Sequence, residues 1–245
     1  LSGRLRRVAQ GGRIVTKGFF VTGTDTEVGK TTIAAGLLYA IRQAGFSTAA
    51  VKPVASGCEM TADGLRNSDA LALLAQCSLT LDYAQVNPFA FAPPIAPHLA
   101  ARQAGIELDV ASLLAPVRQV LALQAQVTVV EGAGGWRVPL SGSAALSDLA
   151  IALQLPVILV VGLRLGCINH ALLSAEAILA DGLPLACWVA NLVDPHTACV
   201  EDVLSTLQQR LPAPCLGRVP WLQDASPAGV AACLKLDPLQ LGICE

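Results

Sequence analysis

Short apolar runs alternate with longer stretches of helical character along most of this chain. The apolar runs, many rich in β-branched residues, predict strands at 18–22, 48–52, 126–131, 156–161, 185–190 and 215–219. Helices are predicted near 30–44, 67–76, 108–124, 168–181 and 197–210. Most strand runs are almost continuously apolar, as is typical of parallel strands covered on both faces. The pattern therefore predicts an α/β fold built on a doubly wound, mostly parallel sheet.

No linker, repeat or low-complexity stretch divides the chain. We therefore expect a single domain over residues 18–245. Residues 1–17 are expected to form a flexible N-terminal extension, and we interpret the basic residues in it as a solvated tail. The segment 87–99 contains four prolines. Because prolines interrupt regular elements, this segment is expected to be an ordered loop.

The composition excludes several classes of protein. With 53% hydrophobic and 14% charged residues, the chain has the opposite balance to a disordered protein. A net charge of -2 gives no electrostatic reason to expect a nucleic-acid partner. The longest apolar run, 155–163, is far shorter than the roughly 20 residues of a membrane helix, so we expect no membrane span. The eight cysteines lack metal-ligand spacing, which favours reduced thiols in the cytoplasm over a zinc site.

Polar or glycine-rich residues stand at or just after the ends of five of the predicted strands. They are the glycine loop after 18–22, Lys52, Glu131, the segment 166–170 and Asn191. Ligands of doubly wound sheets bind beyond the carboxyl ends of the strands. We therefore expect these residues to meet at one edge of the sheet and to form a ligand site there.

The stretch TGTDTEVGKTT, residues 22–32, has the order that a phosphate loop requires: an apolar strand, a glycine-rich turn and the start of a helix. Five residues separate Gly23 from Gly29, one more than in the usual pattern. Backbone amides of the turn and the helix N-terminus would face an anion. Lys30 would reach the β- and γ-phosphates, and the Thr31 hydroxyl would ligate Mg²⁺. A carboxylate at Glu27 is unusual beside phosphates, because like charges repel.

Three further residues complete a candidate site for phosphoryl transfer. Lys52 is either a surface lysine or, if it lies beside the glycine loop, a cation that neutralises a moving phosphoryl group. Glu131 follows an apolar strand directly and resembles a strand-end Mg²⁺ ligand. Asp69 could join Thr31 and Glu131 in a Mg²⁺ site, although the stretch 67–69 could equally cap the next helix.

Eight motifs taken together resemble the dethiobiotin synthetases, a family of P-loop enzymes. They run in order from about residue 19 to 222: TGTDTEVGKT, KPVASG, GLRNSDA, VNPFAF, VEGAGGW, LPVILVVGLRLGCINH, WVAN and VPWL. The glycine loop alone would indicate only a P-loop NTPase, whereas the set is specific. The five-residue spacing is that family's own form, so the resemblance identifies residues 22–32 as a phosphate loop.

The resemblance implies a ligase of biotin biosynthesis. Its substrates would be 7,8-diaminononanoate, CO₂ or bicarbonate, and ATP, with Mg²⁺ as cofactor. One amine would form a carbamate with CO₂, ATP would phosphorylate it, and the second amine would close the ring of dethiobiotin and release phosphate; ADP is the other product. The enzyme would be a cytoplasmic homodimer whose active site lies at the subunit interface.

The resemblance also implies a role for each matching residue. Lys52, Lys30 and Thr26 would be catalytic, and Thr31, Asp69 and Glu131 would hold the metal. ATP would be bound by Glu27, Val28, Gly29, Lys30, Thr31, Thr32, Asp69, Glu131, Gly132, Ala133, Gly134, Asn191, Leu192, Pro220, Trp221 and Leu222. The diamine would meet Thr26, Ser56, Cys167, Ile168 and Asn169. Leu192 stands where the family often has a polar residue, so a looser base selectivity is expected.

Other families account less well for the sequence. A switch ATPase of the partitioning type, which acts through partner binding, usually has a second lysine early in its loop, where this chain has Thr24. Such proteins also often end in a basic amphipathic helix, and none is visible here. A cobyrinate-type synthetase needs a further glutaminase domain, for which this chain is too short. An inactive relative acting as a binding module would not be expected to keep the residues assigned above to catalysis and metal binding.

Overall fold

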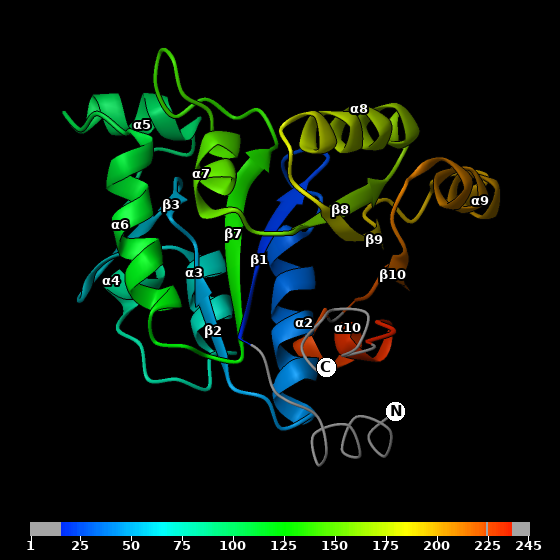
Figure 1. The fold of residues 1–245 in the computed structure, drawn as a ribbon, viewed down its shortest axis with the longest axis horizontal. Coiled ribbons are helices and arrows are strands. Elements are labelled where there is room, and N and C mark those ends of the chain that lie inside the picture. Colours follow the sequence, from blue (N-terminus) through cyan, green and yellow to red (C-terminus); the bar gives the residue numbers. More distant parts are fainter. Residues whose placement is uncertain (1–15, 224, 237–245) are drawn as a thin grey trace.

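A computed structural model describes residues 16–223 and 225–236 of the chain. Its centre is a parallel sheet of six strands in the order β10-β9-β8-β1-β7-β2 (Figure 1). The strands are β1 (Lys17–Gly23), β2 (Thr48–Val51), β7 (Val127–Gly135), β8 (Val157–Leu163), β9 (Leu185–Leu192) and β10 (Cys215–Val219). All six correspond to predicted strands, and the parallel, doubly wound α/β sheet is confirmed.

The helices in the described residues include all five predicted ones and four others. The predicted helices are α2 (Lys30–Gln43), α3 (Ser68–Leu74), α6 (Val110–Leu121), α8 (Cys167–Ala180) and α9 (Val200–Arg210). The others are α4 (Tyr83–Val86), α5 (Pro97–Gln103), α7 (Leu146–Leu153) and α10 (Pro227–Ala232). The sequence pattern does not reveal α7, because its apolar residues run directly into those that lead to β8 and hide the helical period. None of the described helices is long and apolar enough to cross a membrane.

The prediction of a loop over 87–99 was wrong in part. The strand β6 (Phe89–Ala90) pairs with β3 (Val54–Ala55), and α5 begins at Pro97. A proline fits the first position of a helix, since its missing N–H would have had no partner there and its φ is already helical. A second small pair of strands, β4 (Glu59–Thr61) and β5 (Gly64–Arg66), forms a hairpin after β3.

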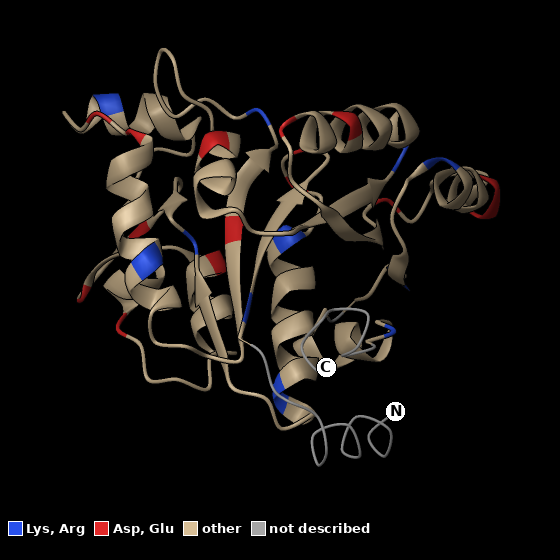
Figure 2. Ribbon diagram, viewed as in Figure 1, with Lys and Arg blue, Asp and Glu red and all other residues tan. Residues whose placement is uncertain are grey.

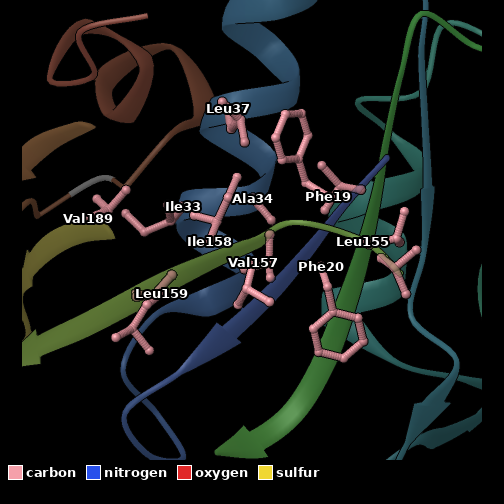
Figure 3. Packing of buried hydrophobic residues seen from close by; sticks show 14 of the residues in the cluster. Phe19, Phe20, Ile33, Ala34, Leu37, Leu155, Val157, Ile158, Leu159 and Val189 are labelled. Carbon is pink, nitrogen blue, oxygen red and sulfur yellow. The ribbon is translucent and has the colours of Figure 1, made fainter. Parts of the chain in front are cut away.

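The sheet is buried between side chains on both faces. Successive residues of a strand point to opposite faces. Phe19 lies on the side of Ile33 and Leu37 from α2, whereas Phe20 points the other way (Figure 3). Phe20 meets the ring of Trp136 edge to face at 6.0 Å between centroids. This two-sided burial explains why the central strands read as continuous apolar runs.

The order of the strands brings the predicted site residues to one edge. Strand β7 lies between β1 and β2, so the first two strands are not neighbours. The carboxyl ends of these three strands nevertheless lie side by side, and they carry the glycine loop, Glu131 and Lys52. Figure 2 shows an acidic position inside β7, the strand that holds Glu131, near the first turn of α2.

Candidate active site

The turn between β1 and α2 has the geometry of a phosphate loop. Helix α2 begins at Lys30, and Gly29 before it has a left-handed φ of 82°. A Cβ at Gly29 would also lie 2.2 Å from Nδ2 of Asn191, so only glycine fits this position. Glu27 has a φ of 58°, which is uncommon for a residue with a side chain and marks a tightly constrained turn.

Lys30 folds back over this loop. Its Nζ donates a hydrogen bond of 2.9 Å to the backbone oxygen of Asp25. Burial lowers the pKa of the Lys30 ammonium to about 8, and the positive charge of Lys52 adds to this effect while the Glu131 carboxylate opposes it. The lysine is thus held beside the loop and partly desolvated, which strengthens its attraction to a phosphate.

Glu131 and Lys52 form the buried centre of the site. One oxygen of the Glu131 carboxylate, Oε1, accepts hydrogen bonds from Lys52 Nζ at 2.6 Å and from the Thr31 hydroxyl at 2.7 Å. Lys52 Nζ also lies 3.0 Å from Oδ2 of Asp69. Glu131 is fully buried, and Lys52 is 4% exposed. Residues from β7, from the end of β2 and from the first turns of α2 and α3 therefore converge on one point.

Lys52 keeps its proton in this setting. Burial works against the charge of the ammonium, but the Glu131 and Asp69 carboxylates outweigh burial and raise the pKa of Lys52. A lysine with a raised pKa is a fixed cation at neutral pH and does not serve as a base. The alternative that Lys52 is an ordinary surface lysine was wrong.

The oxygen atoms beside Lys52 suit a magnesium ion. The second oxygen of Glu131, Oε2, is buried and has no hydrogen-bond partner, so one carboxylate acceptor is unused. The described residues contain no group of three His, Cys, Asp or Glu side chains that could hold a metal. A site here would therefore combine the Thr31 hydroxyl with Asp69 and Glu131, and Mg²⁺ commonly takes one or two carboxylates with phosphate oxygens and water.

Asp69 does not cap its own helix. The side chain of Asn67 fulfils that role, because its Oδ1 accepts from the amides of Asp69 and Ala70 at 3.1 and 3.2 Å. The Asp69 carboxylate is left free to pair with Lys52. The sequence left open which residue of 67–69 caps the helix. The structure assigns the cap to Asn67 and the ion pair with Lys52 to Asp69.

A pocket opens beside the phosphate loop. It has a volume of about 270 Å³, and its lining includes half of the residues predicted to bind the nucleotide: Glu27, Gly29, Thr32, Asn191, Leu192, Pro220, Trp221 and Leu222. Nδ2 of Asn191 donates to the Val28 carbonyl at 2.9 Å. This bond uses the amide nitrogen of Asn191 and does not involve its amide oxygen. Trp221 is 52% exposed at the rim, where an aromatic ring could stack on a base.

Two glycines at the end of β7 lie against the phosphate loop. Gly135 pairs with Gly23, so β7 continues past Glu131, where the predicted strand ended. A Cβ at Gly134 would lie 3.5 Å from the Thr26 hydroxyl. Gly134 and Gly135 therefore lie alongside the phosphate loop, whereas a Cβ at Gly132 would meet Phe20 and Leu146.

The start of α8 lies apart from the residues around Lys52. Cys167 and Ile168 line a separate pocket with Asp194 and Thr197, and Asn169 is exposed in the first turn of α8. In this single chain, the hydrogen bonds that join Lys52, Thr31, Asp69 and Glu131 do not include these three residues. The Ser56 carbonyl accepts a hydrogen bond of 3.5 Å from Nδ2 of Asn67, the residue that caps α3.

Sequence reasoning missed several residues that hold the site together. Arg164 forms an ion pair with Asp25 and thereby joins the turn after β8 to the phosphate loop. Nε1 of Trp136 donates to Asp181 at 2.7 Å and fixes the end of the β7 segment to the end of α8. These partners are far apart in the sequence, and no local pattern indicates them.

Comparisons with known proteins agree with this geometry. A family model described as an AAA domain matches residues 17–228. An ATP-dependent dethiobiotin synthetase of Pseudomonas aeruginosa (strain UCBPP-PA14) is 73% identical over 225 residues, which cover 92% of this chain and 99% of that protein. The protein of the same name from Chromohalobacter salexigens is 58% identical over 217 residues, covering 85% and 92%.

Solved structures with low sequence identity share the fold alone. A signal recognition particle 54 kDa protein from Aeropyrum pernix has a TM-score of 0.52 at 15% identity, covering 93% of this chain and 48% of that one. A ParA family ATPase from Chlorobium tepidum has a TM-score of 0.51 at 12% identity, covering 90% and 91%. The high identity to the curated relatives, over nearly the whole of both chains, is decisive, and the chain belongs to the ATP-dependent dethiobiotin synthetase family.

Proposed function

We propose that this protein converts 7,8-diaminononanoate, CO₂ and ATP to dethiobiotin, ADP and phosphate, as a ligase of biotin biosynthesis. The observation that carries the proposal is the buried Lys52, held 2.6 Å from Glu131 and 3.0 Å from Asp69 beside the phosphate loop. A carbamate and the phosphoryl group that it receives are both anions. A fixed cation at the strand edge, next to the phosphate loop, suits their stabilisation.

Each charged residue near the loop has a distinct task in this proposal. Lys30 and the loop amides bind the phosphates of ATP. Lys52 stays protonated and stabilises negative charge on the carbamate and on the transferring group. Thr26 and Ser56 line the diamine site, whereas the Glu27 carboxylate lies at the nucleotide pocket with Asn191 and Trp221.

The residues assigned to Mg²⁺ are Thr31, Asp69 and Glu131. When bound, the ion would neutralise charge on the phosphate oxygens of ATP. The Lys52 ammonium lies between the two carboxylates, and the Thr31 hydroxyl donates to Glu131. The unused Oε2 of Glu131 and the partly exposed carboxylate of Asp69 are the oxygens best placed to accept the ion.

The start of α8 belongs to the substrate site of a second subunit in this proposal. Cys167, Ile168 and Asn169 begin a helix whose N-terminus carries partial positive charge and suits the carboxylate of the diamine. Leu165 is fully exposed and Leu173 is 56% exposed, so this surface has apolar side chains for a partner subunit to cover. The homodimer and a cytoplasmic location both stay predictions.

One experiment tests the function directly. Purified protein is given ATP, Mg²⁺ and bicarbonate, with and without 7,8-diaminononanoate, and phosphate release is followed together with the product mass. We expect diamine-dependent release and a product with the mass of dethiobiotin. ATP turnover that ignores the diamine would refute the proposal and favour a switch ATPase. Lys52→Ala should lower the diamine-dependent part by about 10²–10³ or more.

A further inference from the structure

Lys52 and Asp69 come from separate parts of the chain, and hydrogen bonds through other residues join the two segments. Lys52 follows β2, whereas Asp69 lies in the first turn of α3. Their charged ends must stay close to each other and to Thr31 and Glu131. A chain of hydrogen bonds that begins in the VNPFAF motif joins the two segments.

The backbone of Lys52 is held on both sides by residues 86–87. Its N–H donates to the Val86 carbonyl at 2.7 Å. Its carbonyl accepts from Nδ2 of Asn87 at 2.8 Å, and the same Nδ2 lies 3.3 Å from the Phe89 carbonyl. Asn87 is 3% exposed, so it is a buried polar side chain whose hydrogen bonds cannot be replaced readily by water.

The start of α3 is held by Asn67. Its Oδ1 caps the helix through the amides of Asp69 and Ala70, which fixes the first turn that carries the Asp69 carboxylate. Asn67 is itself 6% exposed. The direction in which Asp69 points therefore depends on where the backbone of Asn67 is anchored.

Tyr83 connects these two anchors. Its hydroxyl accepts a hydrogen bond of 2.8 Å from the backbone N–H of Asn67 and donates one of 3.0 Å to Oδ1 of Asn87. The second bond also fixes the orientation of the Asn87 amide, because Oδ1 faces the hydroxyl and Nδ2 must face the carbonyl of Lys52. The Arg66 guanidinium lies 4.2 Å from the centre of the Tyr83 ring and covers it.

We propose that Tyr83 is a positioning residue that sets the distance between the Lys52 ammonium and the Asp69 carboxylate. One hydroxyl group links the backbone of the catalytic lysine, through Asn87, to the capped helix start that presents the metal-binding carboxylate, through Asn67. This inference rests on the proposed function, because it takes the roles of Lys52 and Asp69 from it. Tyr83 itself touches neither the substrate nor the metal.

The test compares Tyr83→Phe with Tyr39→Phe. Phenylalanine keeps the ring under Arg66 and removes only the hydroxyl. Tyr39 is the chain's other tyrosine, lies in α2 and takes no part in this network, so it controls for the loss of a phenol. For each protein we would measure the melting temperature, ATP binding by calorimetry over a series of Mg²⁺ concentrations, the kinetics with the diamine, and amide hydrogen exchange of the segment 67–74 without nucleotide or metal.

The expected result for Tyr83→Phe is a selective change in the site. The Mg²⁺ concentration needed for half-maximal ATP binding should rise about fivefold, which is the effect of about one lost hydrogen bond. The kcat should fall about tenfold, since small displacements of reacting groups are costly, while the KM for the diamine stays within about twofold. Exchange should speed up in the segment 67–74, and Tyr39→Phe should behave as the unchanged protein.

Other results would overturn the inference. One is an unchanged Mg²⁺ dependence in Tyr83→Phe, and another is an equal change in both variants. A third is faster exchange throughout the sheet with a lower melting temperature, which would make Tyr83 a general stabiliser. Adding Asn87→Ala to Tyr83→Phe gives a second check, because residues of one network should not have additive effects on Mg²⁺ dependence. If the unchanged protein makes no dethiobiotin, the proposed function fails, whereas Mg²⁺ dependence and exchange still decide the role of Tyr83.

Discussion

The strongest test of the site is the replacement of Lys52 by methionine. Methionine is similar in length and apolar, so Lys52→Met removes the charge and leaves little empty space. The fully buried Glu131 carboxylate then keeps only the Thr31 hydroxyl as a partner. Removing one member of a buried ion pair costs about 3–5 kcal/mol, because the remaining charge is left without compensation. The second pair, with Asp69, contributes less because that side chain is 45% exposed.

This cost predicts a large loss of stability that a second substitution should largely restore. A chain of this size loses about 2–4 °C in melting temperature per kcal/mol, so Lys52→Met should melt roughly 6–20 °C lower. Adding Glu131→Gln removes the uncompensated charge and should recover most of the loss, to within about 1 kcal/mol of the unchanged protein. Both proteins should lose about 10²–10³ or more in the rate of dethiobiotin formation, since neither has the cation.

The assays are thermal unfolding and urea unfolding, both followed by circular dichroism, in EDTA so that no metal contributes. Lys17→Met, at a partly exposed lysine in β1, controls for the loss of a lysine. The reasoning is refuted if Lys52→Met is as stable as the Lys17 variant, or if the double variant is less stable than Lys52→Met. Glu131→Gln alone should cost less than Lys52→Met, because Lys52 keeps the Asp69 carboxylate at 3.0 Å.

Three further predictions concern the nucleotide pocket and the thiols. Gly29→Ala places a Cβ 2.2 Å from Asn191 Nδ2 at a φ of 82°, so ATP affinity measured by calorimetry should fall about tenfold or more; unchanged affinity would show that the loop can relax. Trp221→Ala should weaken ATP binding about fivefold or more through lost stacking, with an unchanged melting temperature; equal affinity would place the base elsewhere. Burial raises the pKa of Cys187 to about 12, so this thiol stays protonated between pH 7 and pH 9. Iodoacetamide should therefore spare Cys187 in the folded protein and modify the exposed Cys199. Labelling of Cys187 ahead of Cys199 in peptide maps would contradict this.

The sequence determined much of the fold because local signals agreed with the tertiary arrangement. The six central strands read as apolar runs since side chains cover the sheet on both faces. The glycine loop was visible because the left-handed φ at Gly29 and its contact with Asn191 permit no side chain. Lys52 and Glu131 could be singled out because each follows such a run, and ligand sites of these sheets lie at the ends of strands.

The tertiary structure decided what these residues do to one another. Strand order is not encoded locally, so only the fold shows that β7 lies between β1 and β2 and puts Glu131 against Lys52. Likewise, the sequence left open which residue caps α3, and the fold assigns the cap to Asn67 and frees Asp69. Tyr83 carries no sequence signal, because its hydroxyl joins segments that meet only after folding. A chain pattern records burial and turns, which are local, whereas charge pairing and hydrogen-bond networks depend on distances between segments that are remote in sequence.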